Sequence, residues 1–286
     1  MVGSKQRAMS QRILEAVLAE LEAGRPVVLA RITDFRGSVP RKDSPYYAFF
    51  TDGRQLGTVG GGCLDVFAQR LAAQVMEQGG SLTVEQHLDS EDAQESGLIC
   101  GGRVTVEARR LEAGAQDRAL LQAMLADPAV QPPRLLVFGG GHVGLAAARI
   151  AHDAGFAVSV IDDREEYASA LRFPFAERCL AGEVSRAGEL PALGGRDAVL
   201  IATRGHAYDL EALAWALRCQ AGFIGLLGSR RKRDVIARKL IEMGIGADEF
   251  QSRCRCPVGL EIGAVTPEEI AVAAVAQLIA FRRDAL

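Results

Sequence analysis

The feature that most constrains the fold is a glycine-rich loop in the second half of the chain, Gly-Gly-Gly-His-Val-Gly at residues 139–144. An apolar run at 135–138 precedes the loop, and a helical pattern over 142–154 follows it. Strand, glycine loop and helix in this order predict the first unit of a Rossmann fold, whose helix start offers unpaired N–H groups to a phosphate. Asp162 follows after about 20 residues, where such folds carry the acid that binds a ribose. Because this acid disfavours a 2′-phosphate, the pattern favours an NAD-like or adenosine ligand over NADP.

Three glycines of the loop have separate expected roles. Gly139 allows a tight turn, Gly141 lets the backbone approach a pyrophosphate, and Gly144 lets the helix pack on the strand. His142 lies inside the loop, and His206 directly follows another expected strand. Since ligands of open α/β sheets bind outside the carboxyl ends of the strands, we expect both histidines to face a ligand. The alternative is a Rossmann-like domain that binds no dinucleotide.

Alternating strand and helix patterns continue through the second half. Strands are expected at 157–161, 198–202 and 223–227, with helices after the second and third of them. This alternation predicts a parallel sheet with helices on both faces. Thr266 and Glu269 form a capping box that begins the last helix.

The first half mixes helices and strands without this regular alternation. Its expected helices cover 10–21 and 64–76, and its expected strands cover 26–32, 46–50, 82–88 and 104–108. Prolines between 127 and 133 suit a linker. We therefore predict a mixed α/β N-terminal domain over 1–125, followed by a Rossmann-like parallel-sheet domain over 134–286 that binds a nucleotide.

Composition narrows the classes of function. The 286 residues are 49% hydrophobic and 24% charged, as in a globular protein, and the net charge is −3. This charge argues against broad binding to nucleic acid or to an anionic membrane. The longest apolar stretch, 270–281, is too short for a transmembrane helix, and the N-terminus lacks the apolar core of a secretory signal. Six sparse cysteines do not form a secreted disulfide framework, so we expect a reducing cytoplasm.

Two cysteines of the first half lie against glycine runs. Gly60, Gly61 and Gly62 precede Cys63, and their backbone amides suit an anion-binding nest. Cys63 is expected at the start of a helix, whose dipole favours the thiolate. Cys100 also adjoins glycines, and the two thiols could meet at one site to ligate a soft metal or accept sulfur. The alternative is that both are small residues in unrelated turns.

The remaining cysteines have a structural interpretation. Residues 179 and 219 fall in an expected strand and helix, and the pair at 254 and 256 has no second pair to complete a zinc pattern. We expect Cys179 and Cys219 to pack in the interior, and we do not expect Cys254 and Cys256 to form a metal site. His87 and His152 have no comparable context and are expected at the surface.

A second phosphate position is expected where a strand and a glycine turn precede the basic run Arg-Arg-Lys-Arg at 230–233. Ser229 and Arg230 stand at the start of a helix and are expected to contact the phosphate. Lys232 and Arg233 are expected on a solvated helix face.

These motifs in this order resemble the XdhC/CoxI family, accessory proteins of xanthine dehydrogenase and related molybdenum hydroxylases. The matching segments cover nearly the whole chain: 37–41, 57–64, 99–102, 138–143, 162–164, 172–174, 203–209, 224–231, 257–264 and 266–271. Three features depart from the family pattern. Segment 42–49 replaces a glycine and a methionine-containing strand, Asp65 stands where Glu is usual, and Gln277 stands where an acid is common.

The resemblance implies a chaperone that binds the molybdenum cofactor, as molybdopterin or its dinucleotide form. Such a protein supports sulfuration of the cofactor by a cysteine desulfurase and its delivery to a molybdenum hydroxylase. The family is usually oligomeric and commonly dimeric, so the resemblance implies a homodimer. On this hypothesis the protein is an accessory protein rather than an enzyme. Cys63 and Cys100 would contact molybdenum or sulfur, and the glycine amides and Arg230 would contact the phosphate or dinucleotide tail.

The main rival is an NAD-dependent oxidoreductase, which the glycine loop and Asp162 support. Against it, the sequence offers no recognisable hydride-transfer partner beyond His142 and His206. A third hypothesis is an assembly protein whose Rossmann unit is a scaffold for dimerisation.

Overall fold

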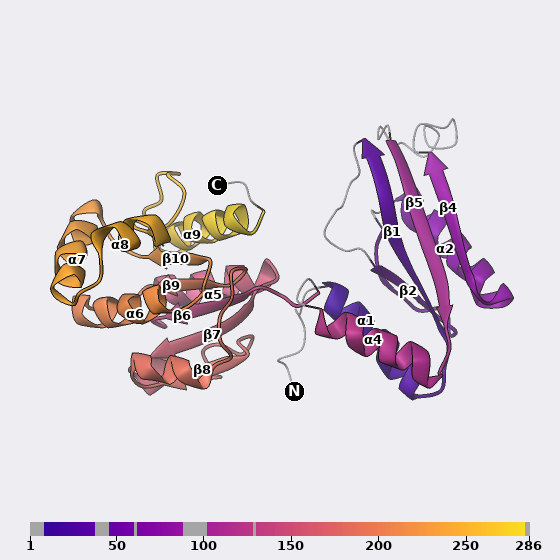
Figure 1. Cartoon of the computed structure of the whole chain (residues 1–286), viewed down its shortest axis with the longest axis horizontal. Helices are drawn as coiled ribbons and strands as arrows, with labels where there is room; N and C mark the ends of the chain where they lie inside the picture. The colour runs from indigo at the N-terminus through magenta and orange to yellow at the C-terminus, as the bar shows by residue number, and fades with distance from the viewer. Residues whose placement is uncertain (1–8, 38–45, 60–61, 88–101, 128–129, 284–286) are drawn as a thin grey trace. The chain divides into compact units, whose positions relative to one another are not determined.

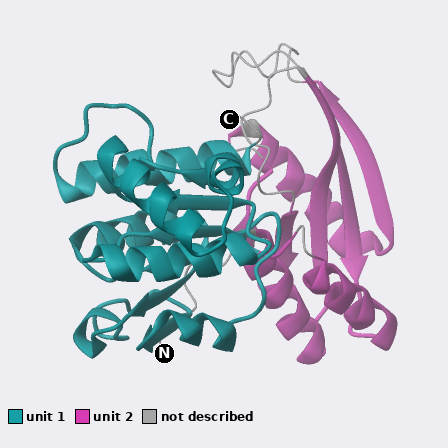
Figure 2. Cartoon of the chain, turned by 60° about the vertical axis from the view of Figure 1, so that its left-hand side comes forward, with its two compact units in different colours: residues 1–7, 132–286 teal, residues 8–131 magenta. Residues whose placement is uncertain are grey.

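The computed structural model describes residues 9–37, 46–59, 62–87, 102–127 and 130–283 (Figure 1). Contacts divide the chain into two compact units, residues 8–131 and residues 132–286 (Figure 2). The division falls in the proline-containing segment between the two halves of the sequence. Among the described residues, the helices are too short or too polar to cross a bilayer.

The first unit is an antiparallel five-stranded sheet with helices on both faces. Its sheet order is β3-β2-β1-β5-β4. The strands are β1 (Val27–Gly37), β2 (Tyr46–Phe50), β3 (Gln55–Gly57), β4 (Ser81–His87) and β5 (Gly102–Leu111). The helices are α1 (Met9–Glu22), α2 (Cys63–Gln78) and α4 (Ala115–Ala126). These elements confirm the predicted mixed α/β character of the first half.

Alternation along β1 assigns the two faces of this sheet. Val28 and Ala30 are fully buried in the core formed with α2, whereas Val27 is fully buried in the core formed with α1 and α4. Side chains of a strand point alternately to opposite faces, so a central strand covered on both sides has apolar residues at successive positions. The apolar run that predicted this strand is therefore the mark of a strand between two helical layers.

The second unit is a six-stranded parallel sheet in the order β11-β10-β9-β6-β7-β8. The strands are β6 (Arg134–Phe138), β7 (Ala157–Asp162), β8 (Arg178–Ala181), β9 (Ala198–Ile201), β10 (Phe223–Leu226) and β11 (Cys254–Arg255). The helices are α5 (His142–Asp153), α6 (His206–Arg218), α7 (Arg230–Glu242), α8 (Ala247–Arg253) and α9 (Pro267–Arg282), with short 3-10 turns at Glu165–Tyr167 and Val184–Glu189. The parallel sheet with helices on both faces confirms the predicted Rossmann-like class.

The two faces of this sheet have separate cores. Leu136 and Phe138 of β6 pack with α6, α7 and α8, and Leu135 and Val137 pack with α5 and α9. Because β7 lies on one side of β6 and β9 on the other, the order reverses between β6 and β9. Open α/β sheets bind ligands at this reversal, outside the carboxyl ends of the strands.

The capping box predicted for the last helix is confirmed. The Thr266 hydroxyl accepts from the Glu269 N–H at 3.2 Å, and the Glu269 carboxylate accepts from the Thr266 N–H at 3.0 Å. Farther along α9, the Gln277 side-chain oxygen accepts from the Gly259 N–H at 2.8 Å. The amide that departs from the family pattern thus holds the segment before α9 against the helix.

His152 is half-buried, so the expected surface position is met only in part. Its ring lies against Phe175, with 5.1 Å between ring centroids. Burial disfavours the charged imidazolium and lowers the pKa of His152 below its ordinary value. His87, at the end of β4, is exposed as expected.

The shifted pKa of His152 predicts a loss of stability in mild acid. Below about pH 6.5 the unfolded chain binds the proton more readily than the folded chain, so the free energy of unfolding falls as the pH drops. Replacing His152→Phe keeps the ring contact and removes the proton site, and should flatten this part of the profile. Urea unfolding of both proteins at about pH 7.5 and about pH 5.5 measures the difference. An identical pH dependence in the two proteins would contradict the prediction.

Candidate functional site

The glycine loop lies at the reversal of strand order, between the ends of β6 and β9. Gly139 has a φ of +103°, and a Cβ there would lie 2.3 Å from the Ala202 carbonyl oxygen. A Cβ on Gly144 would lie 1.9 Å from the Gly139 carbonyl oxygen. Only glycine satisfies the turn at Gly139 and the close approach of helix to strand at Gly144. The fold therefore accounts for the tight turn and the helix packing expected of these two residues.

Gly141 differs because no contact with the described residues requires glycine at this position. Its φ of −64° suits any residue, and a Cβ there would meet no atom within 4 Å. Gly141 caps α5 without a side-chain hydrogen bond to the helix start. His142 is the first residue of α5 and is exposed. The open space lies where a Rossmann ligand places its phosphate, against the N–H groups of a 12-residue helix.

Gly140 is held by the chain that follows β7. Its N–H donates to Asp162 Oδ2 at 2.8 Å, and its carbonyl oxygen accepts from Arg172 Nε at 2.9 Å. A Cβ on Gly140 would lie only 1.8 Å from the Tyr167 carbonyl oxygen. Segment 164–172 therefore packs directly on the glycine loop.

Asp162 is 3% exposed at the end of β7 and forms a salt bridge with Arg164 at 2.9 Å. Burial alone would raise the pKa of Asp162, but hydrogen bonds from the Arg164 side chain and the Gly140 N–H outweigh it and hold the pKa below its ordinary value. The carboxylate is therefore charged at neutral pH. The sequence placed this acid beside the glycine loop, and the structure adds Arg164 as its partner.

A second network stands at the end of β9. Asp209 in the first turn of α6 is 1% exposed and accepts from the Thr203 hydroxyl at 2.8 Å. Lys232 Nζ lies 2.7 Å from Asp209 Oδ2 and donates to the Leu227 carbonyl oxygen at 2.8 Å. Lys232 was expected on a solvated face, and this expectation is wrong because α7 packs beside α6 and turns the residue inward. The ion pair fixes the helix starts that follow β9 and β10.

Three more predicted residues stand at helix starts on the same edge of the sheet. His206 is the first residue of α6 and is exposed, next to Gly205, where a Cβ would meet no atom within 4 Å. Ser229 caps α7, and its hydroxyl accepts from the Lys232 N–H at 3.2 Å. Arg230 is exposed and pairs with Glu261 at 3.2 Å. The second unit thus brings together the predicted positions near the starts of α5, α6 and α7.

The cysteine-bearing loop of the first unit is described in part. Gly57 has a φ of +94°, and a Cβ there would lie 2.4 Å from the Tyr46 carbonyl oxygen. The Asp65 carboxylate accepts from the Thr58 hydroxyl and, at 2.8 Å, from the Val59 N–H. Asp65, which stands where the family usually has Glu, therefore ties the loop to α2.

Cys63 opens α2, as predicted, and Gly62 before it has a φ of +56°. Gly60, Gly61 and Cys100 lie outside the described residues. The meeting of the two thiols therefore stays a prediction.

The other cysteines pack in the second unit, as expected for Cys179 and Cys219. Cys254 and Cys256 are buried in the core with α6, α7 and α8, and burial raises both pKa values, that of Cys256 to about 11. Cys179 and Cys219 are half-buried, and burial raises their pKa values as well. All four thiols are therefore protonated at neutral pH and poor nucleophiles. In the described part of the chain, no cluster of three or more acidic, histidine or cysteine side chains could hold a metal.

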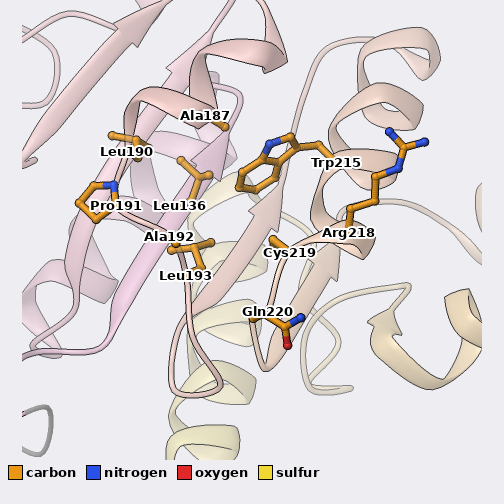
Figure 3. A pocket seen from close by; sticks show the side chains of 11 residues that line it. Leu136, Ala187, Leu190, Pro191, Ala192, Leu193, Trp215, Arg218, Cys219 and Gln220 are labelled. Atoms are coloured by element: carbon orange, nitrogen blue, oxygen red, sulfur yellow. The ribbon is translucent and has the colours of Figure 1, made fainter.

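A pocket of about 400 Å³ lies away from the glycine loop (Figure 3). It is lined by residues that precede β9 and β10, at the amino ends of those strands, including Pro191 and Gln220. The ring of Trp215 from α6 extends toward Leu136 and Ala187 (Figure 3). The candidate phosphate-binding groups lie at the other edge of the sheet, so this pocket is separate from the candidate site.

Four residues of the site were not predicted from the sequence: Arg164, Arg172, Thr203 and Asp209. All four lie within segments that carry the family resemblance, which was the available signal. Their partners are set by the packing of one loop on another, which hydrophobic periodicity does not report.

Two matches with known families follow this division of the chain. Residues 135–278 match the XdhC Rossmann domain, and residues 20–86 match the XdhC and CoxI family. The chain belongs to the XdhC/CoxI family. The two matches include the glycine loop and Asp162 in the second unit and Cys63 in the first.

Similar proteins carry names connected with molybdenum enzymes. A Bacillus subtilis protein named as a probable xanthine dehydrogenase component is 28% identical over 332 residues, covering 95% of this chain and 97% of that protein. The molybdenum cofactor insertion chaperone PaoD of Escherichia coli is 22% identical, covering 94% and 88%. The E. coli protein YqeB is 32% identical over 262 residues, and this XdhC/CoxI chain spans only 44% of its length. A solved Bacillus halodurans structure described as a xanthine dehydrogenase has a TM-score of 0.80 and 25% identity, with 96% of each chain covered.

Proposed function

We propose that this XdhC/CoxI protein is an accessory protein that binds the molybdenum cofactor and delivers it to a hydroxylase of the xanthine dehydrogenase type. Family membership across both units is the observation that carries the proposal. The name of the similar PaoD supports the molybdenum cofactor as the bound cargo. The name of the B. subtilis relative supports a hydroxylase of the xanthine dehydrogenase type as the client that receives it. We include sulfuration of the cofactor, with a cysteine desulfurase as partner, in the proposal.

The second unit offers a fit for the phosphate of this cargo. The space at Gly141 is open, and the start of α5 presents backbone N–H groups to it. The exposed His142 and His206, at the starts of α5 and α6, can donate hydrogen bonds to such a ligand. The helix dipole and the N–H groups favour an anion without requiring a particular base or sugar. This chemistry suits either molybdopterin or its dinucleotide form.

In the first unit, taken by itself, we propose Cys63 as a contact for molybdenum or for transferable sulfur. Cys63 stands at the start of the 16-residue helix α2, where the dipole favours a thiolate. A soft thiolate is a ligand suited to molybdenum or to transferable sulfur. We propose that Cys63 and Cys100 supply this contact. We also propose a homodimer, from the family resemblance, and a cytoplasmic location, from the sparse cysteine content.

Cofactor retention tests the thiol role. Loss of outer-shell partners already costs roughly 10–100-fold in metal affinity, so loss of a direct thiolate contact should lower the bound molybdenum at least tenfold. We therefore expect Cys63→Ala and Cys100→Ala, purified from a cofactor-competent host, each to retain far less molybdenum and pterin per chain than wild type. Elemental analysis and fluorescence of the oxidised pterin provide the measurement. Cys219→Ala, a half-buried thiol of the other unit, is the control and should retain the wild-type amount. Unchanged retention in both test variants would refute the thiol role.

A further inference from the structure

The acid that binds the ribose in dinucleotide-binding Rossmann folds has a different set of partners here. Asp162 stands at the end of β7, the position from which such an acid accepts the 2′-hydroxyl. Four donors already reach its carboxylate. Oδ1 accepts from Arg164 N–H at 3.0 Å and from Arg164 Nε at 2.9 Å, and Oδ2 accepts from Gly140 N–H at 2.8 Å and from Arg164 Nη2 at 3.1 Å. An ionised carboxylate has about four lone-pair positions, so none is left for a ribose hydroxyl.

The guanidinium that fills these positions is itself fixed. Arg164 Cζ lies 3.5 Å from the centroid of the Tyr167 ring, which is close stacking. Arg172 lies over the same ring at 5.0 Å and donates to the Gly140 carbonyl oxygen. Only 24% of the Arg164 side chain is exposed. A ribose could reach Asp162 only by displacing a bidentate, stacked arginine.

The space beside Gly140 is also closed. The Tyr167 carbonyl oxygen would lie 1.8 Å from a Cβ at Gly140, so the two backbones are in contact. By contrast, the space beside Gly141 is open. In the described part of the chain, segment 164–172 thus occupies one side of the glycine loop, and the side at the start of α5 is open.

We infer that Asp162 is a positioning residue, which fixes Gly140 and Arg164, and that Arg164 excludes the adenosine ribose of NAD from this unit. The site selects ligands that bind through a phosphate at Gly141 and need no ribose contact at β7. This exclusion argues against the rival NAD-dependent oxidoreductase. It does not rest on the proposed cargo, because NAD binding and molybdenum retention are measured independently.

A titration calorimetry experiment with NAD⁺ on the full chain tests the inference. Wild type should bind no NAD⁺ up to about 1 mM, the upper end of ordinary enzyme–substrate affinities. Arg164→Ala frees the Asp162 oxygens and should gain at least about tenfold in affinity, the value of one charged hydrogen bond. The double variant Asp162→Asn/Arg164→Ala should lose that gain. Arg204→Ala removes an equally charged, exposed side chain that pairs with Asp163, and should behave as wild type.

Two results would overturn the inference. The first is micromolar binding of NAD⁺ to wild type, which needs no variant and so does not depend on how the variants fold. The second is the absence of any gain in a folded Arg164→Ala, checked by circular dichroism, with Arg164→Ser as a second replacement that also opens the space.

Discussion

Replacing Gly139 with alanine is expected to lower the free energy of unfolding of residues 132–286 by about 2–5 kcal/mol. Two penalties combine. A non-glycine residue at positive φ costs about 1–2 kcal/mol, and forcing a methyl group into a packed position costs about 1–3 kcal/mol. At Gly139 the φ is +103°, and the new Cβ would meet the Ala202 carbonyl oxygen at 2.3 Å. Gly139 directly follows β6 and Ala202 directly follows β9, so neighbouring strands of the sheet limit how far either backbone can shift.

Thermal and urea unfolding of the full chain measure this loss, with Gly141→Ala as the matched control. Gly141 has ordinary backbone angles and open space around the built Cβ. We expect its replacement to change stability by no more than about 0.5 kcal/mol, as for a surface substitution. The same methyl group would stand where the proposed phosphate binds, so cofactor retention should fall in this stable variant. Equal destabilisation by the two substitutions would contradict the separate roles of the glycines.

Replacing Lys232 with methionine is the second change from which we expect a large effect, a destabilisation of about 3–5 kcal/mol. The variant leaves the Asp209 carboxyl group, which is 1% exposed, without the ammonium group that lies 2.7 Å away. Methionine keeps most of the volume of the side chain, so the loss reports the charge rather than a cavity. The hydrogen bond from Lys232 to the Leu227 carbonyl oxygen is lost as well.

Arg230→Met is the control for the lysine variant. Arg230 is two residues away on the same helix, and its ion pair with Glu261 is exposed, with side-chain exposures of 77% and 92%. Exposed pairs contribute about 0–1 kcal/mol, so this variant should unfold close to wild type. Adding Asp209→Asn to Lys232→Met should recover part of the lost stability, because the buried charge is then removed. Equal losses of unfolding free energy in Lys232→Met and Arg230→Met would show that the buried pair stabilises the protein no more than the exposed one.

The sequence predicted the elements that are long enough to repeat a pattern. Apolar runs marked β6, β7, β9 and β10, and the capping box marked the start of α9. β3 and β11 contain three and two residues, and such short strands have no periodicity to detect. Their pairing depends on neighbouring strands that are already in place.

The candidate site was predictable in position but not in its partners. Glycine spacing and the distance to Asp162 located the loop, because these are properties of the chain itself. Arg164 donates to the Asp162 carboxylate because segment 164–172 packs on Gly140. The same limit explains Lys232, since a run of four cations does not say which one faces a neighbouring helix. Tertiary contacts decide both cases.

The first and last helices of the N-terminal unit, α1 and α4, pack against each other, with Leu14 and Leu121 fully buried in one shared core. The polypeptide therefore enters and leaves this unit through a pair of adjoining helices. Domains with neighbouring ends can be joined to other sequences, or placed inside longer ones, without threading a strand through their core. We therefore expect that this unit can be fused to another sequence at either end while its five-stranded sheet stays intact.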